Sequence, residues 1–160
     1  MEMCFLFWPQ ASIYLSISIS FLPLCHFPLQ KVTDMTFKEG QEFKIRVKPS
    51  DDCNSFSINI GHDAENIGMH FNPRFDASGD TNTIVFNSKS GGDWGEECRE
   101  GNFPFVRGEE CKFHINLSME SFYIKLPDGS MLDFPNRLGD IKYKYFSIGG
   151  DARIVGIKIK

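Results

Sequence analysis

The sequence contains no run of Lys or Arg and no Cys-x-x-Cys pair, and these absences argue against several classes of protein. Its 160 residues carry a formal net charge of −4, which argues against nucleic acid as a partner. Clustered zinc ligands are also missing, because the 5 cysteines and 4 histidines are scattered along the chain. The odd cysteine count argues against a closed disulfide framework and favours free thiols in a reducing compartment. We therefore predict no metal site and no cofactor.

The first part of the chain lacks charge, since no Lys, Arg, Asp or Glu occurs between Met3 and Gln30. A secretory signal needs a basic start and a small-residue cleavage site, whereas this segment begins with Glu2 and has no Ala-x-Ala site. Serines and prolines also interrupt the run of about 20 apolar residues that a membrane span needs. Three interpretations remain: an unusual signal-like segment, a disordered apolar tail, or an extension from a misassigned start or exon. We favour the last, and expect residues 1–30 to provide neither a functional signal peptide nor membrane insertion.

Residues 31–160 have the pattern of a single all-β domain. Four segments alternate between apolar and polar residues, as strands with one buried face do. These segments are 43–48, 56–60, 112–117 and 122–126. Turn-forming residues separate the strands, at 49–52, 78–80, 90–93 and 127–129. No window of about twelve residues has a convincing helical period, so the pattern predicts a sandwich of two antiparallel sheets.

A row of polar side chains is the most informative feature of the sequence. His70, Asn72 and Arg74 alternate with apolar residues, so a strand would place all three on one face. The row would span roughly 13 Å at about 3.3 Å per residue, which suits a disaccharide better than a single small ion. Sugar hydroxyls both donate and accept hydrogen bonds, and these three side chains supply both kinds of partner. The row therefore predicts a sugar-binding face.

Further polar residues continue this pattern downstream. Asn87 follows in the next apolar segment. Glu97 and Arg99 come after it and are two residues apart, so a strand would place both on one face. Trp94 is the only tryptophan beyond residue 8, and glycines around it suggest a turn that presents its indole. A flat indole is a suitable platform for the apolar face of galactose. The whole set predicts a lectin-type site.

Three strings in this region resemble the signature of the galectins, the β-galactoside-binding lectins. They are His-x-Asn-x-Arg, Val-x-Asn and Trp-x-x-Glu-x-Arg, and here they comprise His70, Asn72, Arg74, Val85, Asn87, Trp94, Glu97 and Arg99. The likeness continues through FPF at 103–105, LPDG at 126–129 and FPNRLG at 134–139, and covers about residues 32–160. It implies a jelly-roll-like, concanavalin-like sandwich with these eight residues as the carbohydrate-binding site.

The resemblance also implies roles for the individual residues. His70, Asn72 and Arg74 would bind the galactose 4-hydroxyl, whereas Asn87 and Glu97 would bind the 6-hydroxyl. In the family the tryptophan stacks on the galactose ring and the last arginine helps to bind the second sugar. One departure is visible, because many vertebrate single-domain galectins have a His in the loop that here comprises residues 76–80. Contacts beyond the disaccharide are therefore open.

Partners and location are implied in the same way. The expected ligands are β-galactoside-containing glycans and glycoproteins, which a homodimer paired through terminal strands would crosslink. Residues 152–160 have apolar side chains that such an edge could use. Galectins fold in the cytosol and leave cells without a signal peptide, so we expect cytoplasmic and extracellular protein. The sequon at Asn116 would then stay unmodified.

Two other functions are alternatives to a lectin. A glycosidase needs two carboxylates beside the scissile bond, and the sequence places only Glu97 in the site, where Arg99 would keep it ionised. No Gly-x-Ser-x-Gly nucleophile motif is present either. An interaction module that has lost sugar binding is the other alternative, and the intact motif argues against it. We therefore predict a protein that is not an enzyme and has no catalytic residues.

Overall fold

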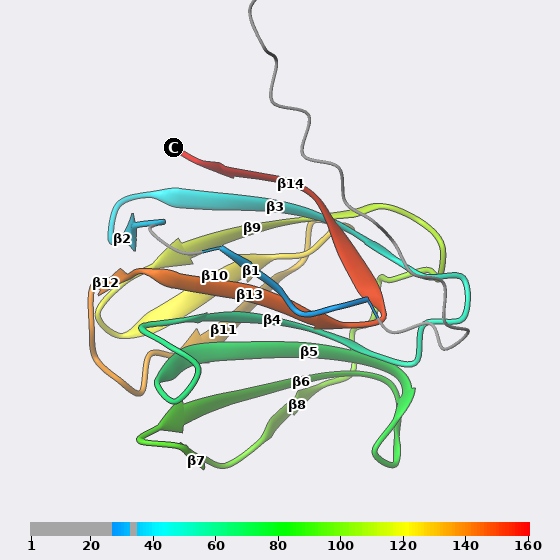
Figure 1. Ribbon diagram of the computed structural model, residues 1–160, viewed down its shortest axis with the longest axis horizontal. Coiled ribbons are helices and arrows are strands. Elements are labelled where there is room, and N and C mark those ends of the chain that lie inside the picture. The colour runs from blue at the N-terminus through cyan, green and yellow to red at the C-terminus, as the bar shows by residue number, and fades with distance from the viewer. Residues whose placement is uncertain (1–26, 33–34) are drawn as a thin grey trace, which may run out of the picture.

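The computed structural model describes residues 27–32 and 35–160, and all the regular structure in these residues is β-strand (Figure 1). One sheet has the order β1-β13-β4-β5-β6-β7, with β8 also paired to β6, and the other has the order β11-β10-β9-β3-β14. The strands of the first are β1 Gln30–Val32, β13 Tyr145–Gly150, β4 Phe56–Gly61, β5 Ile67–Ala77, β6 Asp80–Ser90, β7 Asp93–Trp94 and β8 Cys98–Glu100. Those of the second are β11 Met131–Pro135, β10 Ser121–Lys125, β9 Cys111–Leu117, β3 Glu42–Pro49 and β14 Ala152–Ile159. A small third sheet pairs β2 Phe37–Lys38 with β12 Lys142–Tyr143.

The sandwich of two antiparallel sheets predicted from the sequence is confirmed. The strands expected at 43–48, 56–60, 112–117 and 122–126 correspond to β3, β4, β9 and β10, with ends that differ by one residue or less. No helix in the described residues is long and apolar enough to cross a membrane. The regular alternation of buried and more exposed residues along β3 and β9 explains why these strands could be predicted from the sequence.

Phenylalanine fills the space between the two sheets. Phe71 and Phe86 come from the first sheet and Phe113 from the second, and the Phe71 ring centroid lies 5.2 Å from that of Phe86 and 5.3 Å from that of Phe113. All three are almost completely buried. Each such side chain contributes about 1.5–3 kcal/mol by leaving water. This packing gives the outer face of β5 a rigid support.

The extension expected over residues 1–30 lies largely outside the described residues. Its last residue belongs to the fold, because β1 begins at Gln30, one residue before the boundary that we expected. The Gln30 side chain also spans two edges, since its Nε2 donates to the Ala152 carbonyl at 3.1 Å and its Oε1 accepts from the Ile154 N–H at 2.8 Å. β1 and β14, the end strands of the two sheets, therefore lie side by side at one edge of the sandwich.

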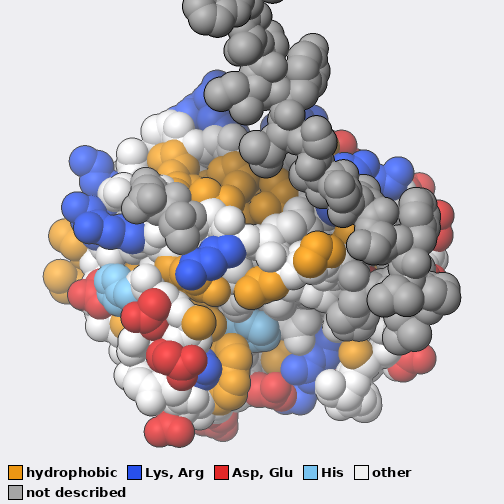
Figure 2. Space-filling model, viewed as in Figure 1, with side chains coloured by type: hydrophobic (Ala, Val, Ile, Leu, Met, Phe, Trp, Pro, Cys, Tyr) orange, Lys and Arg blue, Asp and Glu red, His pale blue; other side chains and the backbone are white. Residues whose placement is uncertain are grey.

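This shared edge carries apolar surface. Figure 2 shows hydrophobic side chains gathered between β14 and β1. Val32, Ile154, Ile157 and Ile159 are only partly buried and pack against the rim of the core. Among the described residues β14 has a neighbouring strand on one side alone, which is β3. An unpaired strand edge with apolar neighbours is a natural surface for association.

Candidate functional site

The polar row lies on the face of β5 that is turned away from the core. Met69 and Phe71 point inward and are buried, whereas His70, Asn72 and Arg74 lie on the opposite face, as strand alternation predicts. Asn72 and Arg74 are each only 8% exposed, because neighbouring polar side chains cover them. The row is thus a packed polar layer in which each side chain is held by its neighbours.

The pairing of β5, β6 and β8 extends the row across three strands. Asn87 lies directly opposite His70, and Val85 lies opposite Asn72. Arg99 on β8 lies opposite Val85 in turn. Residues directly opposite in antiparallel strands share a face, so all five belong to one surface. Val85 is fully buried and is not part of the main hydrophobic cluster, so it forms an apolar floor beneath this polar layer.

Arg74 is the centre of the layer. Its Nε donates to Asn72 Oδ1 at 2.8 Å, its Nη1 to Asp80 Oδ2 at 2.7 Å and its Nη2 to Glu97 Oε1 at 3.1 Å. Asn72 Nδ2 donates to the Phe56 carbonyl at 2.7 Å, which fixes the orientation of that amide. A guanidinium has five N–H donors and an amide nitrogen has two, so Arg74 keeps two donors and Asn72 keeps one.

Two arginines enclose two carboxylates at the end of the row. Arg99 Nε donates to Asp80 Oδ1 at 3.0 Å, and Arg99 Nη2 donates to Glu97 Oε2. Hydrogen bonds from Arg99 and Arg74 hold the pKa of Asp80 below its usual value. Desolvation opposes the ionisation of Glu97, but hydrogen bonds from Arg74 and Arg99 outweigh it and also lower its pKa. Both carboxylates therefore stay ionised at neutral pH and act only as acceptors.

His70 is fixed as a neutral acceptor. Asn59 Nδ2 donates to Ser147 Oγ at 3.0 Å, so Asn59 Oδ1 faces His70 Nδ1 at 2.6 Å and receives its proton. Burial, together with the Arg74 cation, lowers the pKa of His70 to about 4. At neutral pH the ring therefore has its proton on Nδ1, and Nε2 is an acceptor.

The Asn87 amide is held in a single orientation. Its Nδ2 donates to the Gly95 carbonyl at 3.0 Å, and its Oδ1 accepts from the Ser88 N–H at 2.8 Å. Arg137 Nη1 also approaches this Oδ1, at 3.4 Å. One Nδ2 hydrogen remains for a ligand, so Asn87 presents a donor beside His70.

Trp94 stands at the side of the row as an exposed platform. Gly91 and Gly92, with φ of 58° and 93°, form the two-residue turn between β6 and β7, and positive φ at both positions is typical of a type I′ hairpin. The turn leaves Trp94 51% exposed, with its ring centroid 4.8 Å from that of His70. Lys89 Nζ lies 5.7 Å from the Trp94 ring centroid. An apolar surface thus stands next to a row of fixed donors and acceptors.

The structure brings all eight residues predicted from the sequence to one surface, and it adds three that we missed. Asp80 bridges the two arginines, Asn59 sets the proton of His70, and Arg137 contacts Asn87. The expectation that Glu97 was the only carboxylate of the site was therefore wrong. Asp80 lies in the loop whose composition we noted, but its contact with Arg74 depends on the hairpin register.

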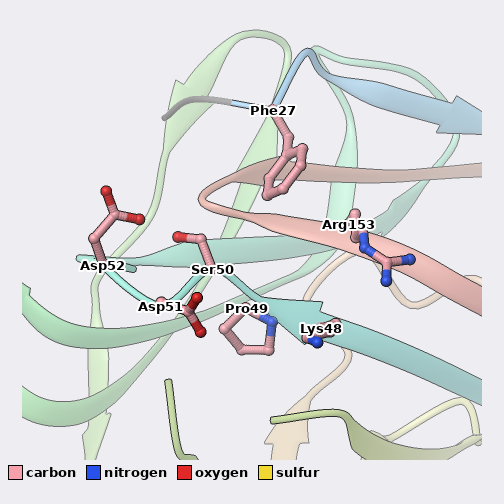
Figure 3. Close-up of a pocket in the computed structure, with 7 residues that line it drawn as sticks. All are labelled: Phe27, Lys48, Pro49, Ser50, Asp51, Asp52 and Arg153. Carbon is pink, nitrogen blue, oxygen red and sulfur yellow. The ribbon is translucent and has the colours of Figure 1, made fainter. Parts of the chain in front are cut away.

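A hollow of the described surface lies elsewhere. It has a volume of about 450 Å³ and is lined by Phe27, Lys48, Pro49, Ser50, Asp51, Asp52 and Arg153 (Figure 3). None of the eight predicted residues lines it. The polar row is an open surface, and an open surface suits a flat, hydroxylated ligand that keeps one side in water. Among residues 27–32 and 35–160 no three His, Cys, Asp or Glu side chains are grouped as metal ligands.

The sandwich and its polar row define a β-sandwich protein of the carbohydrate-recognition type, and known proteins agree. The galactoside-binding lectin family profile matches residues 28–159. A beta-galactoside-binding lectin of Electrophorus electricus is 48% identical over 126 residues, which are 79% of this chain and 93% of that protein. CG-16, a homodimeric agglutinin from chicken liver, superposes with a TM-score of 0.79 at 38% identity, covering 83% of this chain and 100% of its own. Lactose- and MES-liganded congerin II superposes with a TM-score of 0.81 at 30% identity and the same coverage. This chain belongs to the galactoside-binding lectin family, the galectins.

Proposed function

We propose that this protein binds β-galactosides such as lactose and N-acetyllactosamine, without metal and without catalysis. The observation that carries the proposal is the row of fixed donors and acceptors beside the exposed Trp94. The lactose-liganded congerin II supports it, since that protein has the same fold and binds this sugar. The eight residues of the motif, with Asp80 as a bridge between the arginines, form the proposed site.

The hydrogen-bond donors and acceptors that the row leaves available match an axial hydroxyl. The galactose 4-hydroxyl would donate its proton to His70 Nε2, because Nδ1 already holds the ring proton. The same oxygen would accept from the donors that Arg74 and Asn72 keep free. Asn87 and Glu97 would bind the 6-hydroxyl as donor and acceptor, and Arg99 would bind the second sugar. The apolar face of galactose would lie against Trp94.

An equatorial 4-hydroxyl would not reach the same partners, so the site distinguishes galactose from glucose.

Titration calorimetry of the full chain should give a dissociation constant of about 10 μM to 1 mM for lactose, since an open site gains only about 0.5–1.5 kcal/mol per hydrogen bond before association costs. Cellobiose, which differs in the 4-hydroxyl of its terminal sugar, should give no measurable heat, and a chelator should change nothing. Equal binding of the two disaccharides would contradict the proposal.

The pKa of His70 gives this binding a defined pH dependence. His70 is neutral above a pKa of about 4, so lactose affinity should be constant from about pH 8 down to about pH 5. Below about pH 4 protonation of Nε2 removes the acceptor, and affinity should fall about tenfold per pH unit. Calorimetry across this range, with circular dichroism at each pH as a control for folding, measures the effect. A loss of affinity centred near pH 6.5 would show that His70 titrates normally.

The same geometry argues against hydrolysis of the bound sugar. A glycosidase needs one protonated carboxyl as general acid. Both Asp80 and Glu97 are paired with arginines that lower their pKa values, so neither is protonated at neutral pH. We therefore propose a binding protein, and prolonged incubation should leave lactose intact.

Weak single sites act through multivalency, and the shared edge of β1 and β14 is a candidate for it. Galectin relatives include the homodimeric agglutinin from chicken liver. A two-fold pairing of β14 with its copy would complete the unpaired edge and cover the apolar side chains of Ile154, Ile157 and Ile159. Two linked sites would crosslink glycoproteins with raised avidity. We propose such a homodimer.

The cysteines support a proposal about where the protein folds. Cys53, Cys98 and Cys111 are free thiols, and burial raises the pKa of both Cys53 and Cys111 to about 12. Buried, protonated thiols are stable in a reducing compartment and unreactive outside it. We propose that the protein folds in the cytoplasm and reaches glycans outside the cell without a signal peptide.

A further inference from the structure

The outer face of the five-stranded sheet is strongly basic, although the chain as a whole is acidic. Exposed or partly exposed cations alternate along its strands, while their neighbours point into the core. They are Lys44, Arg46 and Lys48 on β3, Lys112 on β9, Lys125 on β10, and Arg153 and Lys158 on β14. These cations lie together on one face of a chain whose formal net charge is −4.

The strand register places these cations directly opposite one another. Lys44 is the cross-strand partner of Lys158, and Arg46 is the partner of Lys112. A third pair, Lys48 with Arg153, lies toward the other end of β3. Like charges directly opposite in a sheet destabilise it. Three such pairs on one face make the local electrostatic potential positive. A bound anionic ligand would reduce the repulsion between these cations.

A groove runs between the first two pairs. It has a volume of about 310 Å³ and is lined by Lys44, Arg46, Lys112, Gly156, Ile157 and Lys158. β14 has a bulge between Ile154 and Gly156, and the Arg46 guanidinium lies against Gly156, where a side chain would collide with it. Four of the six residues that line the groove are therefore cations.

Acidic neighbours neutralise only part of this charge. Glu42 lies 2.8 Å from Lys44, and Glu110 lies 3.1 Å from Arg46, in pairs that are partly exposed to solvent and hence weak. Lys112 and Lys158 have no ion pair with any residue in the described part of the chain. Two unneutralised lysines thus face each other across the groove.

We propose that this groove binds a linear sulfated polysaccharide. Its cations repeat about every 6.6–6.8 Å along a strand and about 4.8 Å between strands, so they form a lattice that suits closely spaced sulfates on a stiff chain. None of the lining residues is aromatic, and single-stranded nucleic acid is usually bound by stacking on aromatic rings. The groove lies on the sheet opposite the galactoside row, so both ligands can be bound together.

Heparin titrated against the full chain in saturating lactose, at about 0.15 M salt, tests the proposal. The double variant Lys112→Glu/Lys158→Glu should bind heparin about tenfold more weakly and show a smaller salt dependence, because two attractive contacts become repulsive. The control variant is Lys38→Glu/Lys142→Glu, which reverses an exposed pair of lysines on β2 and β12. It makes the same change in net charge and should bind within about twofold of the unaltered protein.

Four results would overturn the proposal. They are no heparin binding by the unaltered chain, equal weakening by the control variant, heparin binding that is weaker in saturating lactose than without lactose, or equally tight binding of single-stranded RNA of matched charge. Lactose affinity, measured for all the proteins, reports whether the variants are folded. A heparin affinity that falls only in the groove variant, with lactose binding unchanged, supports the proposal.

Discussion

Replacing Arg74 by Lys should reduce lactose affinity by about 100-fold or more. The substitution keeps the charge but removes a planar fork that donates to Asn72, Asp80 and Glu97 at once. A lysine can satisfy only part of this set, and the remaining donors that would meet the 4-hydroxyl are lost as well. Two charge-assisted hydrogen bonds at about 1.5–3 kcal/mol each account for the expected size of the effect. Titration calorimetry of the purified variant measures it.

Arg107→Lys is the matched control for this variant. Arg107 is more exposed than Arg74, but its guanidinium is also held by a hydrogen bond, since its Nε donates to the Cys53 carbonyl at 2.7 Å, away from the polar row. We expect it to lower the melting temperature by a few degrees and to leave lactose affinity within about twofold. If Arg74→Lys bound lactose as tightly as this control, the assignment of Arg74 to the centre of the site would be wrong.

Replacing Val155 by Arg should abolish haemagglutination while lactose affinity per site stays unchanged. Val155 is the extra residue of the β14 bulge, and it lies near the middle of the strand that we propose to pair with its copy. In a two-fold interface residues near the axis meet their own copies, so each substitution brings two arginines together. We expect the dimer to weaken by about 100-fold or more. Sedimentation velocity at a protein concentration on the order of tens of micromolar, where weak interfaces form, measures this effect.

Val106→Arg is the control for this second prediction. Val106 is 54% exposed in a loop, so the same substitution there changes charge and size without altering the β14 edge. It should sediment and agglutinate like the unaltered protein. An unaltered chain that is strictly monomeric under these conditions, or a Val155 variant that still agglutinates, would contradict the proposed homodimer.

Much of the candidate site could be predicted from the sequence because its residues follow a local periodicity. His70, Asn72 and Arg74 alternate with core residues on a single strand, so their common face follows from strand geometry alone. The turn before Trp94 could be predicted from its two consecutive glycines. The strands β3, β9 and β10 could be predicted for the same reason, since buried and more exposed residues alternate along them. The strands β4, β5, β6 and β13 instead contain runs of buried residues.

The residues that were missed depend on pairing between distant segments. Asp80 reaches Arg74 and Arg99 because Ser78 and Gly79, both with positive φ, form a two-residue turn that pairs Ala77 with Asp80. A longer loop with the same residues would have placed the carboxylate elsewhere. Asn59 comes from β4 and Arg137 from a loop 50 residues beyond Asn87, and no local pattern links them to the row.

The basic groove shows the same limit. The sequence displayed Lys44, Arg46 and Lys48 as a row on one strand, which by itself is the pattern of a solvated surface. Its partners on β9 and β14 became visible only through the register that sets Lys112 opposite Arg46 and Lys158 opposite Lys44. A row of charge that is ordinary on one strand becomes a cluster of cations when three neighbouring strands carry it.

A crystal structure of the full chain with lactose is the most direct test of the central claim, that the row on β5 is the galactoside site. We predict galactose stacked on Trp94, with its 4-hydroxyl within hydrogen-bond distance of His70 Nε2 and Arg74, and the second sugar beside Arg99. Lactose bound instead in the hollow lined by Phe27 and Arg153, or bound with its glucose unit over Trp94, would contradict the account.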